Sequence, residues 1–445
     1  MVRRSDFGED FVWGVATSAF QTEGSPLADG KGLSIWDDFS KKKGKIFQGH
    51  AADISSDFYN LYTRDIALMK LMHIENFRFS FSWSRIFPDG AGPVNPKGAD
   101  FYDRVIDLCL ELGIRPWVTL YHWDLPLALE QKKGWVNRDI VDYFSDYTAY
   151  SVNRYGDRVK HWMILNEPTV YTGAGYFLGI HAPGKRGMDN FIPAIHHSAL
   201  AQARGIKISR DLRSDLEVGT TFSCSAIHPH TNRDKDIKAA LRVDALVNRM
   251  FVEPLSGLGY PVDRLPFLKR IEKFMHQHDE NDLFAQPDFI GIQNYTREVV
   301  KHSYFTPYIN STLVHAKKRV QEVTEMHWEI YPQAMHEMLH SFSKYKFRKI
   351  YVTENGAAFP DAVHDGKIHD IKRTNYLQSN IAEILKAKRE GVNVQGYFVW
   401  SLTDNFEWAE GYRPRFGLIH VDYETQKRTI KDSGHWYSDF LNDKV

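Results

Sequence analysis

Residues 349–356 read Lys349-Ile350-Tyr351-Val352-Thr353-Glu354-Asn355-Gly356. The first half of this stretch is β-branched and aromatic, which is the composition of a buried strand. Glu354 comes at the end of that strand, and the Asn-Gly pair after it turns the chain. A carboxylate at the end of an apolar strand is costly unless it has a partner or a task. Because an exposed strand end would explain one such residue, the interpretation depends on a second example.

The second example lies at 161–168, which reads His161-Trp162-Met163-Ile164-Leu165-Asn166-Glu167-Pro168. An apolar run again ends in a carboxylate beside an asparagine, and a proline closes the strand. Two strand-end carboxylates in one fold indicate an active site built on a pair of carboxyl groups.

The bulk composition excludes several classes of partner. The chain has 445 residues, with 56 Lys plus Arg and 56 Asp plus Glu. Because these charges balance, no overall field attracts nucleic acid or an anionic membrane, and we expect neither as a partner. Aromatic residues make up 14% of the chain, enough to pack a core and also to line a pocket for a ligand with apolar faces.

The two cysteines, Cys109 and Cys224, cannot form a disulfide framework, so we interpret both as buried thiols in a reducing compartment. The N-terminal arginines are followed by acidic residues and by no apolar segment, and no stretch is apolar enough to span a bilayer. We therefore predict a soluble, cytoplasmic protein. The sequence is compatible with a homo-oligomer and does not determine the oligomeric state.

Short apolar strands alternate with amphipathic helices along the whole chain. The predicted strands are 12–16, 76–80, 116–120, 162–165, 218–221, 289–293, 350–353 and 396–400. The predicted helices are 56–72, 98–112, 138–154, 192–211, 236–251, 332–345 and 372–389, the third capped by Asn137 and the last ended by Gly391. This alternation predicts an α/β fold, a (β/α)8 TIM barrel with elaborated βα loops, and a doubly wound open sheet is the alternative. Because no linker divides the sequence, we expect 1–445 to form a single catalytic barrel domain.

In such a barrel, function lies at the carboxyl ends of the strands. Polar and aromatic residues gather at these ends: Gln21, Arg78, His122, Asn166, Glu167, Asn294, Tyr295, Glu354 and Trp400. Each residue alone could be core or loop packing. Their convergence on one rim favours a site.

The motifs at this rim resemble those of glycoside hydrolase family 1, the β-glucosidase family, and the likeness extends over about 11–436. The matching segments are Phe11-Val12-Trp13-Gly14 through Gln21, Arg78-Phe79-Ser80, Tyr121-His122-Trp123-Asp124-Leu125-Pro126, Asn166-Glu167-Pro168, Thr353-Glu354-Asn355-Gly356, Trp400-Ser401-Leu402 and Asn405-Phe406-Glu407-Trp408. A single tripeptide would be weak evidence, whereas this order and spacing are specific.

The resemblance implies a retaining β-glycosidase that acts on a small-molecule β-glycoside without a cofactor or a metal. It assigns Glu354 as the nucleophile and Glu167 as the general acid and base. It also implies that Arg78 holds Glu354 ionised, that the pKa of Glu167 is raised by its negative neighbour, and that Tyr295 contacts the nucleophile.

The sugar contacts implied by the resemblance follow residue by residue. Trp400 matches the ring that stacks on the pyranose, and Trp328 matches a ring at the aglycone entrance. The full substrate-binding set is Gln21, His122, Asn166, Asn294, Trp328, Trp400, Glu407, Trp408 and Phe416. The sequence departs from the family pattern at Ile164, Thr169, Thr296, His327 and Thr403, and Thr169, Thr296 and His327 would lie toward the aglycone.

Three alternatives remain open. A 6-phospho-β-glycosidase would replace Trp408 with Ser and carry Lys and Tyr where Pro414 and Phe416 stand, although Arg413 and Arg415 lie nearby. A sugar-binding barrel without activity would have lost a carboxylate or Arg78. A metal-dependent hydrolase would need His196-His197 or His228-Pro229-His230 to belong to a ligand set, and no matching carboxylate motif accompanies them.

Overall fold

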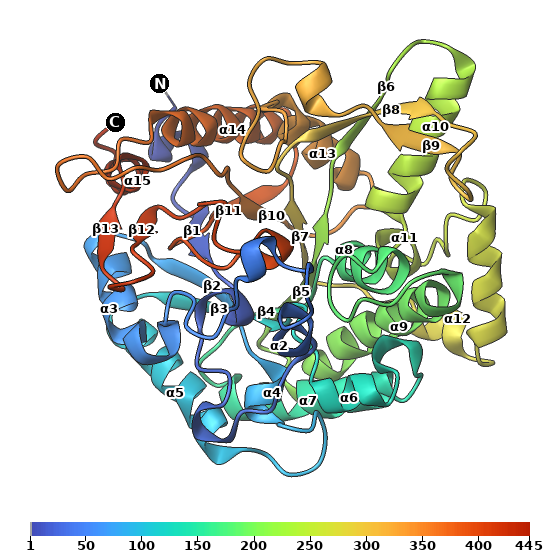
Figure 1. Ribbon diagram of the computed structural model, residues 1–445, viewed down its shortest axis with the longest axis horizontal. Helices are drawn as coiled ribbons and strands as arrows, with labels where there is room; N and C mark the ends of the chain where they lie inside the picture. The colour runs from blue at the N-terminus through green and yellow to red at the C-terminus, as the bar shows by residue number, and fades with distance from the viewer. Residues whose placement is uncertain (1) are drawn as a thin grey trace.

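The computed structural model describes residues 2–445 and shows a closed barrel of eight parallel strands (Figure 1). The order around the barrel is β1-β11-β10-β7-β5-β4-β3-β2, so the last strand pairs with the first. The strands are β1 Val12–Ala16, β2 Asn76–Ser80, β3 Arg115–Tyr121, β4 His161–Asn166, β5 Glu217–Ser223, β7 Phe289–Gln293, β10 Ile350–Asn355 and β11 Val394–Trp400.

The predicted (β/α)8 barrel is confirmed, and the open doubly wound sheet is wrong. β1, β2 and β7 have the predicted bounds, and the other five strands extend by one or two residues at an end. Most of the extra residues are polar, such as Arg115 and Glu217, because barrel pairing continues beyond the apolar run that marks a strand in the sequence.

Helices form the outer layer around the barrel (Figure 1). Those predicted from the sequence are α3 Phe58–Leu71, α5 Pro96–Glu111, α7 Ile140–Tyr155, α9 Met188–Leu212, α10 Asp234–Asp244, α13 Gln333–Ser343 and α14 Ile371–Arg389. The remaining α-helices are the C-terminal helix and several short helices in the connecting segments: α1 Ala19–Thr22, α2 Ile35–Ser40, α4 Trp83–Ile86, α6 Leu127–Gln131, α8 Pro168–Val170, α11 Val252–Leu255, α12 Asp279–Asp282 and α15 Asp432–Leu441.

Two details of the predicted helices are wrong. The predicted helix 236–251 stops being α-helical at Asp244 and continues as the π-helical turn η6, Ala245–Arg249. The N-terminal cap of α7 is Asp139, and Asn137 instead accepts a 3.2 Å hydrogen bond from the Asp139 amide in the preceding turn. Gly391 does end α14, and its φ of +96° explains why glycine occupies that position.

Two small sheets lie in the loops that follow barrel strands, and the sequence pattern missed both. One consists of β6 Ala226–Pro229, β8 Arg297–His302 and β9 Ser311–Leu313, and it rises beside α10 in Figure 1. The other is the ribbon of β12 Ile419–Val421 and β13 Arg428–Ile430. Several of these strands are only three or four residues long, too short for a clear alternating pattern.

The barrel interior is filled by large side chains. Trp117, Met163, Phe289, Tyr351 and Phe398 form one buried cluster inside the strands. The same cluster continues upward to two further rings, Trp400 and Phe416. The barrel interior is therefore a packed core. Its last layer, at the carboxyl ends of the strands, forms the base of the space between the βα loops.

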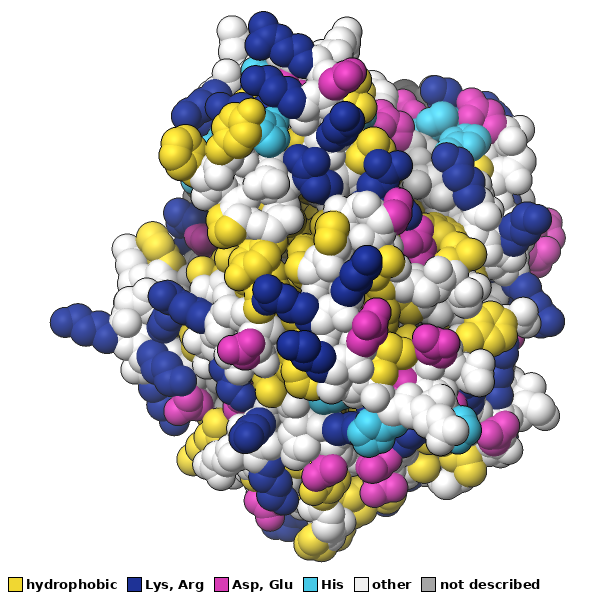
Figure 2. All heavy atoms as spheres, turned by 90° about the vertical axis from the view of Figure 1, so that its right-hand side faces the viewer, with side chains coloured by type: hydrophobic (Ala, Val, Ile, Leu, Met, Phe, Trp, Pro, Cys, Tyr) yellow, Lys and Arg dark blue, Asp and Glu magenta, His cyan; other side chains and the backbone are white. Residues whose placement is uncertain are grey.

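The surface carries no dominant charge on the face shown in Figure 2, where basic and acidic side chains are intermixed. Within residues 2–445, none of the helices combines the length and the apolar character needed to cross a membrane. Cys109 and Cys224 are both buried free thiols, and burial raises the pKa of each above its ordinary value.

Candidate active site

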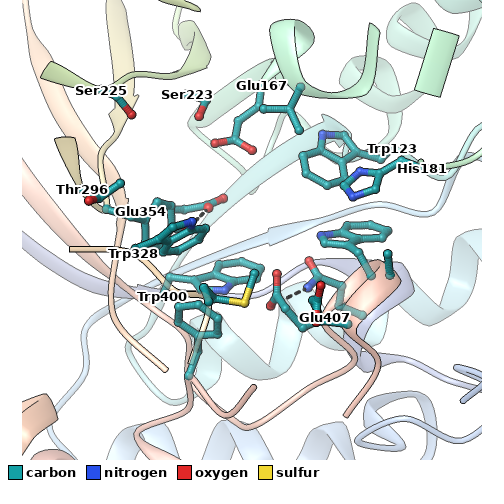
Figure 3. Close-up of a pocket in the computed structure, with 18 of the residues that line it drawn as sticks. Trp123, Glu167, His181, Ser223, Ser225, Thr296, Trp328, Glu354, Trp400 and Glu407 are labelled. Atoms are coloured by element: carbon teal, nitrogen blue, oxygen red, sulfur yellow. Dashed lines mark hydrogen bonds between the residues drawn. The ribbon is translucent and has the colours of Figure 1, made fainter. Parts of the chain in front are cut away.

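A cavity of about 310 Å³ opens at the carboxyl ends of the barrel strands. Most of the predicted site residues line it: Gln21, His122, Glu167, Tyr295, Trp328, Glu354, Trp400, Glu407, Trp408 and Phe416. Arg78, Asn166 and Asn294 do not line the cavity. Figure 3 shows the Glu167, Glu354 and Glu407 side chains extending into one space from three different segments of the chain.

Glu354, at the end of β10, is held by two donors. One oxygen, Oε1, accepts a hydrogen bond of 2.5 Å from the Arg78 guanidinium, and the other, Oε2, accepts one of 2.7 Å from the Tyr295 hydroxyl. The Arg78 and Glu354 side chains are 1% and 5% exposed, so their charges face one another with little water between them. The carboxyl group is thereby fixed in orientation.

Arg78 is itself fixed from the opposite side of its guanidinium. Its second terminal nitrogen donates to Asn166 Oδ1 at 2.5 Å, and its Nε lies 3.0 Å from the sulfur of Met163. β2 supplies this arginine and β4 supplies both of its partners, so side chains from two strands, together with Tyr295 from the loop after β7, set the position of Glu354.

Asn166 joins these strands and also sets the tautomer of a histidine. Its Oδ1 accepts hydrogen bonds from Arg78, Gln293 and Thr221, so its Nδ2 must be the donor in the 3.1 Å contact with His122 Nε2. The proton of the neutral imidazole is then on Nδ1. That atom is buried and has no hydrogen-bond partner among the described residues.

The pKa of His122 supports a neutral ring. Burial lowers this pKa well below 6.5, and the nearby positive charge of Arg78 lowers it further. His122 is therefore a hydrogen-bond donor without a charge at neutral pH.

Glu167 directly follows β4 and has left-handed backbone angles, φ 48° and ψ 60°. This conformation is strained for a residue with a Cβ, and it occurs where the surrounding structure fixes it. Burial raises the pKa of Glu167 well above 4.5, and the negative charge of Glu354 raises it further, while Ser223 and Arg78 oppose the change. Glu167 is therefore the carboxyl group that retains its proton.

The pKa of Glu354 is also raised by burial, a contribution that sequence reasoning did not include. The charge of Arg78 and the hydrogen bonds from Tyr295 and Arg78 oppose this rise. Because Glu167 lacks comparable donors, Glu354 loses its proton at a lower pH than Glu167. Between the two pKa values, Glu354 is ionised and Glu167 is protonated.

Glu407 introduces a third carboxyl group on another side of the cavity. Burial raises its pKa to about 8, and the charge of Glu354 adds to the rise. Gln21 lies beside it, with its amide nitrogen 3.4 Å from Glu407 Oε2 and 3.1 Å from Asn405 Oδ1. The pair presents donors and acceptors within reach of each other, which suits a ligand with adjacent hydroxyl groups.

Aromatic rings cover much of the remaining wall. The centroid of His122 lies 6.0 Å from those of both Trp400 and Trp408, with nearly parallel planes. Trp123 packs on Trp408 at 4.6 Å, and Trp328 packs on Tyr295 at 5.2 Å. A cavity that combines flat apolar faces with converging polar groups is typical of a carbohydrate site.

Comparison with known proteins agrees with this geometry. The model of glycosyl hydrolase family 1 matches residues 3–445. The chain belongs to that family. It is 43% identical to beta-glucosidase A of Thermotoga maritima, over 98% of this chain and 97% of that protein. It is also 35% identical to a 6-phospho-beta-galactosidase of Clostridium acetobutylicum, over 97% of this chain and 96% of that protein.

Solved structures show the same family relationship. A family 1 β-glucosidase from Thermotoga maritima superposes with a TM-score of 0.95 at 42% identity, with 98% of each chain covered. A structure of the Thermotoga maritima enzyme with deoxynojirimycin gives 0.94 at 42% identity, covering 98% of this chain and 99% of that one. The protein is therefore an O-glycoside hydrolase of family 1.

Sequence reasoning missed several residues that line the cavity of this family 1 hydrolase. Trp123 was quoted only as part of a motif, and its left-handed backbone (φ 81°) turns its ring toward Trp408. His181 follows the π-helical turn η5, Tyr171–Leu178, and no motif marks it. The others missed are Val170, Ser223, Cys224, Ser225, Thr296, Glu298, Met326, Ala409 and Glu410, of which Thr296 was noted only as a departure from the family pattern.

Asn294, predicted to bind substrate, has a different environment. Its amide nitrogen donates to the carbonyl oxygens of Cys224 and Thr296, at 2.9 and 3.0 Å. This side chain holds the loops after β5 and β7 together behind the cavity wall. Both hydrogens of the Asn294 amide are therefore used within the protein, and the contact of Asn294 with a substrate stays a prediction.

The histidine clusters weighed as metal ligands do not converge. His196 contacts Asp279 and Tyr260, whereas His197 Nδ1 contacts the carbonyl oxygen of Trp135. His228 is held between Glu337 and Arg297. The rings of His196, His197 and His228 thus have separate partners, and none of the four histidines in these clusters lines the cavity.

Proposed function

We propose that this family 1 hydrolase is a retaining β-glucosidase in which Glu354 is the nucleophile and Glu167 the general acid and base. One observation carries the proposal. Two buried carboxyl groups line the same cavity, and only Glu354 has strong donors on both of its oxygens. That asymmetry supplies an ionised group and a protonated group side by side, as a double displacement requires.

In the first step Glu354 attacks the anomeric carbon and forms a glycosyl ester. The bond from that carbon to the leaving oxygen breaks, and this oxygen takes the proton of Glu167. Each group thus begins in the protonation state that its surroundings favour. The oxocarbenium-like transition state gains from preorganised hydrogen bonds that need no reorientation during the reaction.

In the second step Glu167 takes a proton from water, and the resulting nucleophile displaces Glu354 from the sugar. The change of role follows from charge. Once Glu354 is esterified, it no longer contributes the negative charge that raises the pKa of Glu167. Glu167 therefore ionises and acts as the base, and Glu354 leaves as a carboxylate toward Arg78 and Tyr295.

Glucose is the proposed glycone. Gln21 and Glu407 would contact the hydroxyls at one end of the sugar, and His122, which also lines the cavity, would contact another hydroxyl. Trp400 supplies a ring for the apolar face of the pyranose. The named relatives at 42–43% identity are β-glucosidases or glucan glucohydrolases, which supports this choice. We also propose activity on β-galactosides and β-fucosides. Small shifts would let Glu407 and Gln21 reach the hydroxyls of galactose, the C4 epimer of glucose, and fucose is the 6-deoxy form of galactose.

A 6-phospho-glycosidase activity is disfavoured by the contacts of its candidate cations. The Arg415 guanidinium donates to Asp404 at 2.6 Å, and Arg413 is paired with Glu410. Trp408 fills the position beside Glu407, whose own carboxyl group would repel a phosphate when ionised. The two arginines that could bind a phosphate are thus paired with carboxylates, and the ionised Glu407 would repel it.

We also propose that residues 1–445 act as one catalytic domain. The first and last barrel strands, β1 and β11, pair directly, and Tyr437 of the C-terminal α15 donates to the carbonyl of Gly14 in β1 at 3.0 Å. A barrel closed in this way should unfold in one cooperative transition. Separate melting of two parts in calorimetry would contradict the proposal.

The experiment that tests the function compares two variants on an aryl β-glucoside. Glu354→Gln should fold and show negligible turnover, because the amide cannot form the ester. Glu167→Ala should turn over slowly and recover with added azide on a substrate with a good leaving group, since a small anion needs no base. Glu337→Gln serves as the control, because Glu337 lies on α13 and pairs with His228 outside the cavity.

Full activity in Glu354→Gln would remove the proposed nucleophile. Lack of azide rescue in Glu167→Ala would remove the proposed acid and base. Higher kcat/KM on a 6-phosphoglucoside or on another glycone would contradict the proposed substrate and leave the mechanism intact. A panel of nitrophenyl glycosides together with cellobiose therefore separates the two parts of the proposal.

A further inference from the structure

Two histidines and a glutamate converge on the outer helix layer, far from the residues that line the cavity. The Nε2 atoms of His336 and His340 lie 2.6 and 2.7 Å from the same oxygen of Glu390, Oε2. The three candidate ligand atoms all lie within 4.8 Å of one another. The side chains are 19%, 37% and 43% exposed, so an ion could reach them from solvent.

The helix geometry explains why the two imidazoles meet. His336 and His340 are one turn apart on α13, so their side chains project from the same face, and their ring centroids lie 4.5 Å apart. Two histidines at this spacing offer two nitrogen ligands to one ion without any rearrangement of the backbone.

Glu390 adds the third group from the end of the neighbouring helix. Its backbone N–H bonds to the Lys386 carbonyl at 3.0 Å, and the next residue, Gly391, turns the chain with a φ of +96°. The position of Glu390 is therefore set by the cap of α14. The free carbonyls at a helix C-terminus carry partial negative charge, which favours a cation at this point.

Within the described residues, Glu390 pairs with the two histidines and with no lysine or arginine. Nearby cations have other partners: Lys388 donates to the Val394 carbonyl, and Arg389 lies by Asp6.

We propose that His336, His340 and Glu390 bind one divalent transition-metal ion of the Zn²⁺ class, with water completing the coordination. Two imidazole nitrogens and one carboxylate oxygen are a ligand set that Zn²⁺ accepts, whereas Mg²⁺ and Ca²⁺ prefer oxygen ligands alone. With bonds of about 2.0–2.2 Å, tetrahedral ligands lie about 3.3 Å apart, so the present contacts must open by less than about 1 Å. Rotation of exposed side chains suffices for that movement.

The site would act on stability. α14 ends just before β11 begins, so Glu390 lies at the amino-terminal side of the barrel strands, opposite the cavity at their carboxyl ends. The ion would join α13 to α14, two adjacent helices of the outer layer (Figure 1). Because the ligands meet only in the folded chain, metal binding would favour the folded state.

The test uses the full chain, stripped of metal with a chelator that is then removed. Titration calorimetry with ZnCl2 should show one equivalent bound per chain, and the thermal midpoint should rise with Zn²⁺ and not with Mg²⁺. His336→Ala, His340→Ala and Glu390→Gln should each weaken Zn²⁺ binding by at least about tenfold and abolish the rise in midpoint. His336 and His340 are partly exposed, Glu390 is exposed, and alanine favours the helix at the two histidine positions, so the variants should fold.

His369→Ala provides the matched control, because His369 also pairs with a carboxylate, Asp432 at 2.7 Å, but has no second imidazole. This control should bind Zn²⁺ as the original chain does. The chain has 20 histidines, so the comparison among variants, and not uptake alone, identifies the site. No Zn²⁺-dependent rise in midpoint, or a rise that survives in His336→Ala and His340→Ala, would overturn the proposal.

Discussion

Replacement of Tyr295 by Phe isolates the role of one hydroxyl group. The Tyr295 hydroxyl donates to Glu354 Oε2 at 2.7 Å, while its ring packs against Trp328 and Phe416 at 5.2 and 6.2 Å. Tyr295→Phe keeps the ring and its packing and removes only the donor. The change is therefore confined to the charge on Glu354.

A hydrogen bond to a charged group contributes about 1.5–3 kcal/mol. When the glycosyl ester breaks, Glu354 regains its negative charge, and the transition state should realise about half of that energy. The breakdown of the intermediate should then slow by roughly 4- to 13-fold. The hydrogen bond also lowers the pKa of Glu354, so its removal raises that pKa, and the acidic limb of the kcat/KM profile should move to higher pH.

The assay is stopped-flow hydrolysis of a dinitrophenyl β-glucoside, in which release of the leaving group is fast. Tyr295→Phe should give a burst of about one equivalent followed by a slower steady rate. Tyr155→Phe is the control, because its buried hydroxyl donates to the Ala99 carbonyl at 2.9 Å, away from the cavity. A steady rate within about twofold of the original enzyme, together with an unmoved acidic limb, would refute the reasoning.

Two further predictions concern charge. Glu407→Gln should move the alkaline limb of kcat/KM to lower pH, because the negative charge of Glu407 raises the pKa of Glu167. The measurement is a pH profile that extends above and below the Glu407 pKa of about 8. An alkaline limb that moves to higher pH would contradict this prediction. Lys431→Met should lower the free energy of unfolding by about 3–5 kcal/mol at pH 7, because the buried Lys431 Nζ lies 2.7 Å from Asp404 and also pairs with Asp361. Burial alone would raise the pKa of Asp404, but Lys431 and Arg415 outweigh it and lower that pKa, so the stability from this pair is present above pH 3.8 and is lost as pH falls further. Urea unfolding at pH 7 and pH 3 should therefore show a smaller difference between variant and original chain at the lower pH, and an equal difference would count against the pairing.

The sequence alone was enough to predict the barrel and to nominate the two carboxyl groups that we propose as the reacting pair. Runs of β-branched and aromatic residues are local signals, because they favour a strand whichever other segments that strand packs against. Glu167 and Glu354 stand at the ends of such runs, so a parallel barrel must bring both to the same rim. The motifs around the two glutamates indicated the family, and the likeness to that family implied the residues expected to contact the sugar.

Only the tertiary structure decided how these groups are tuned. Asn166 receives donors from β2, β5 and β7, and this convergence fixes the tautomer of His122. The order in which Glu354 and Glu167 lose their protons depends on burial and on the reach of Arg78, neither of which has a signature along the chain. The pairing of His336 and His340 is visible as a helical spacing, but Glu390 comes 50 residues after His340 and joins them only through the packing of α14 on α13. Desolvation and long-range contact are properties of the folded chain, because each depends on which distant segments exclude water from a group.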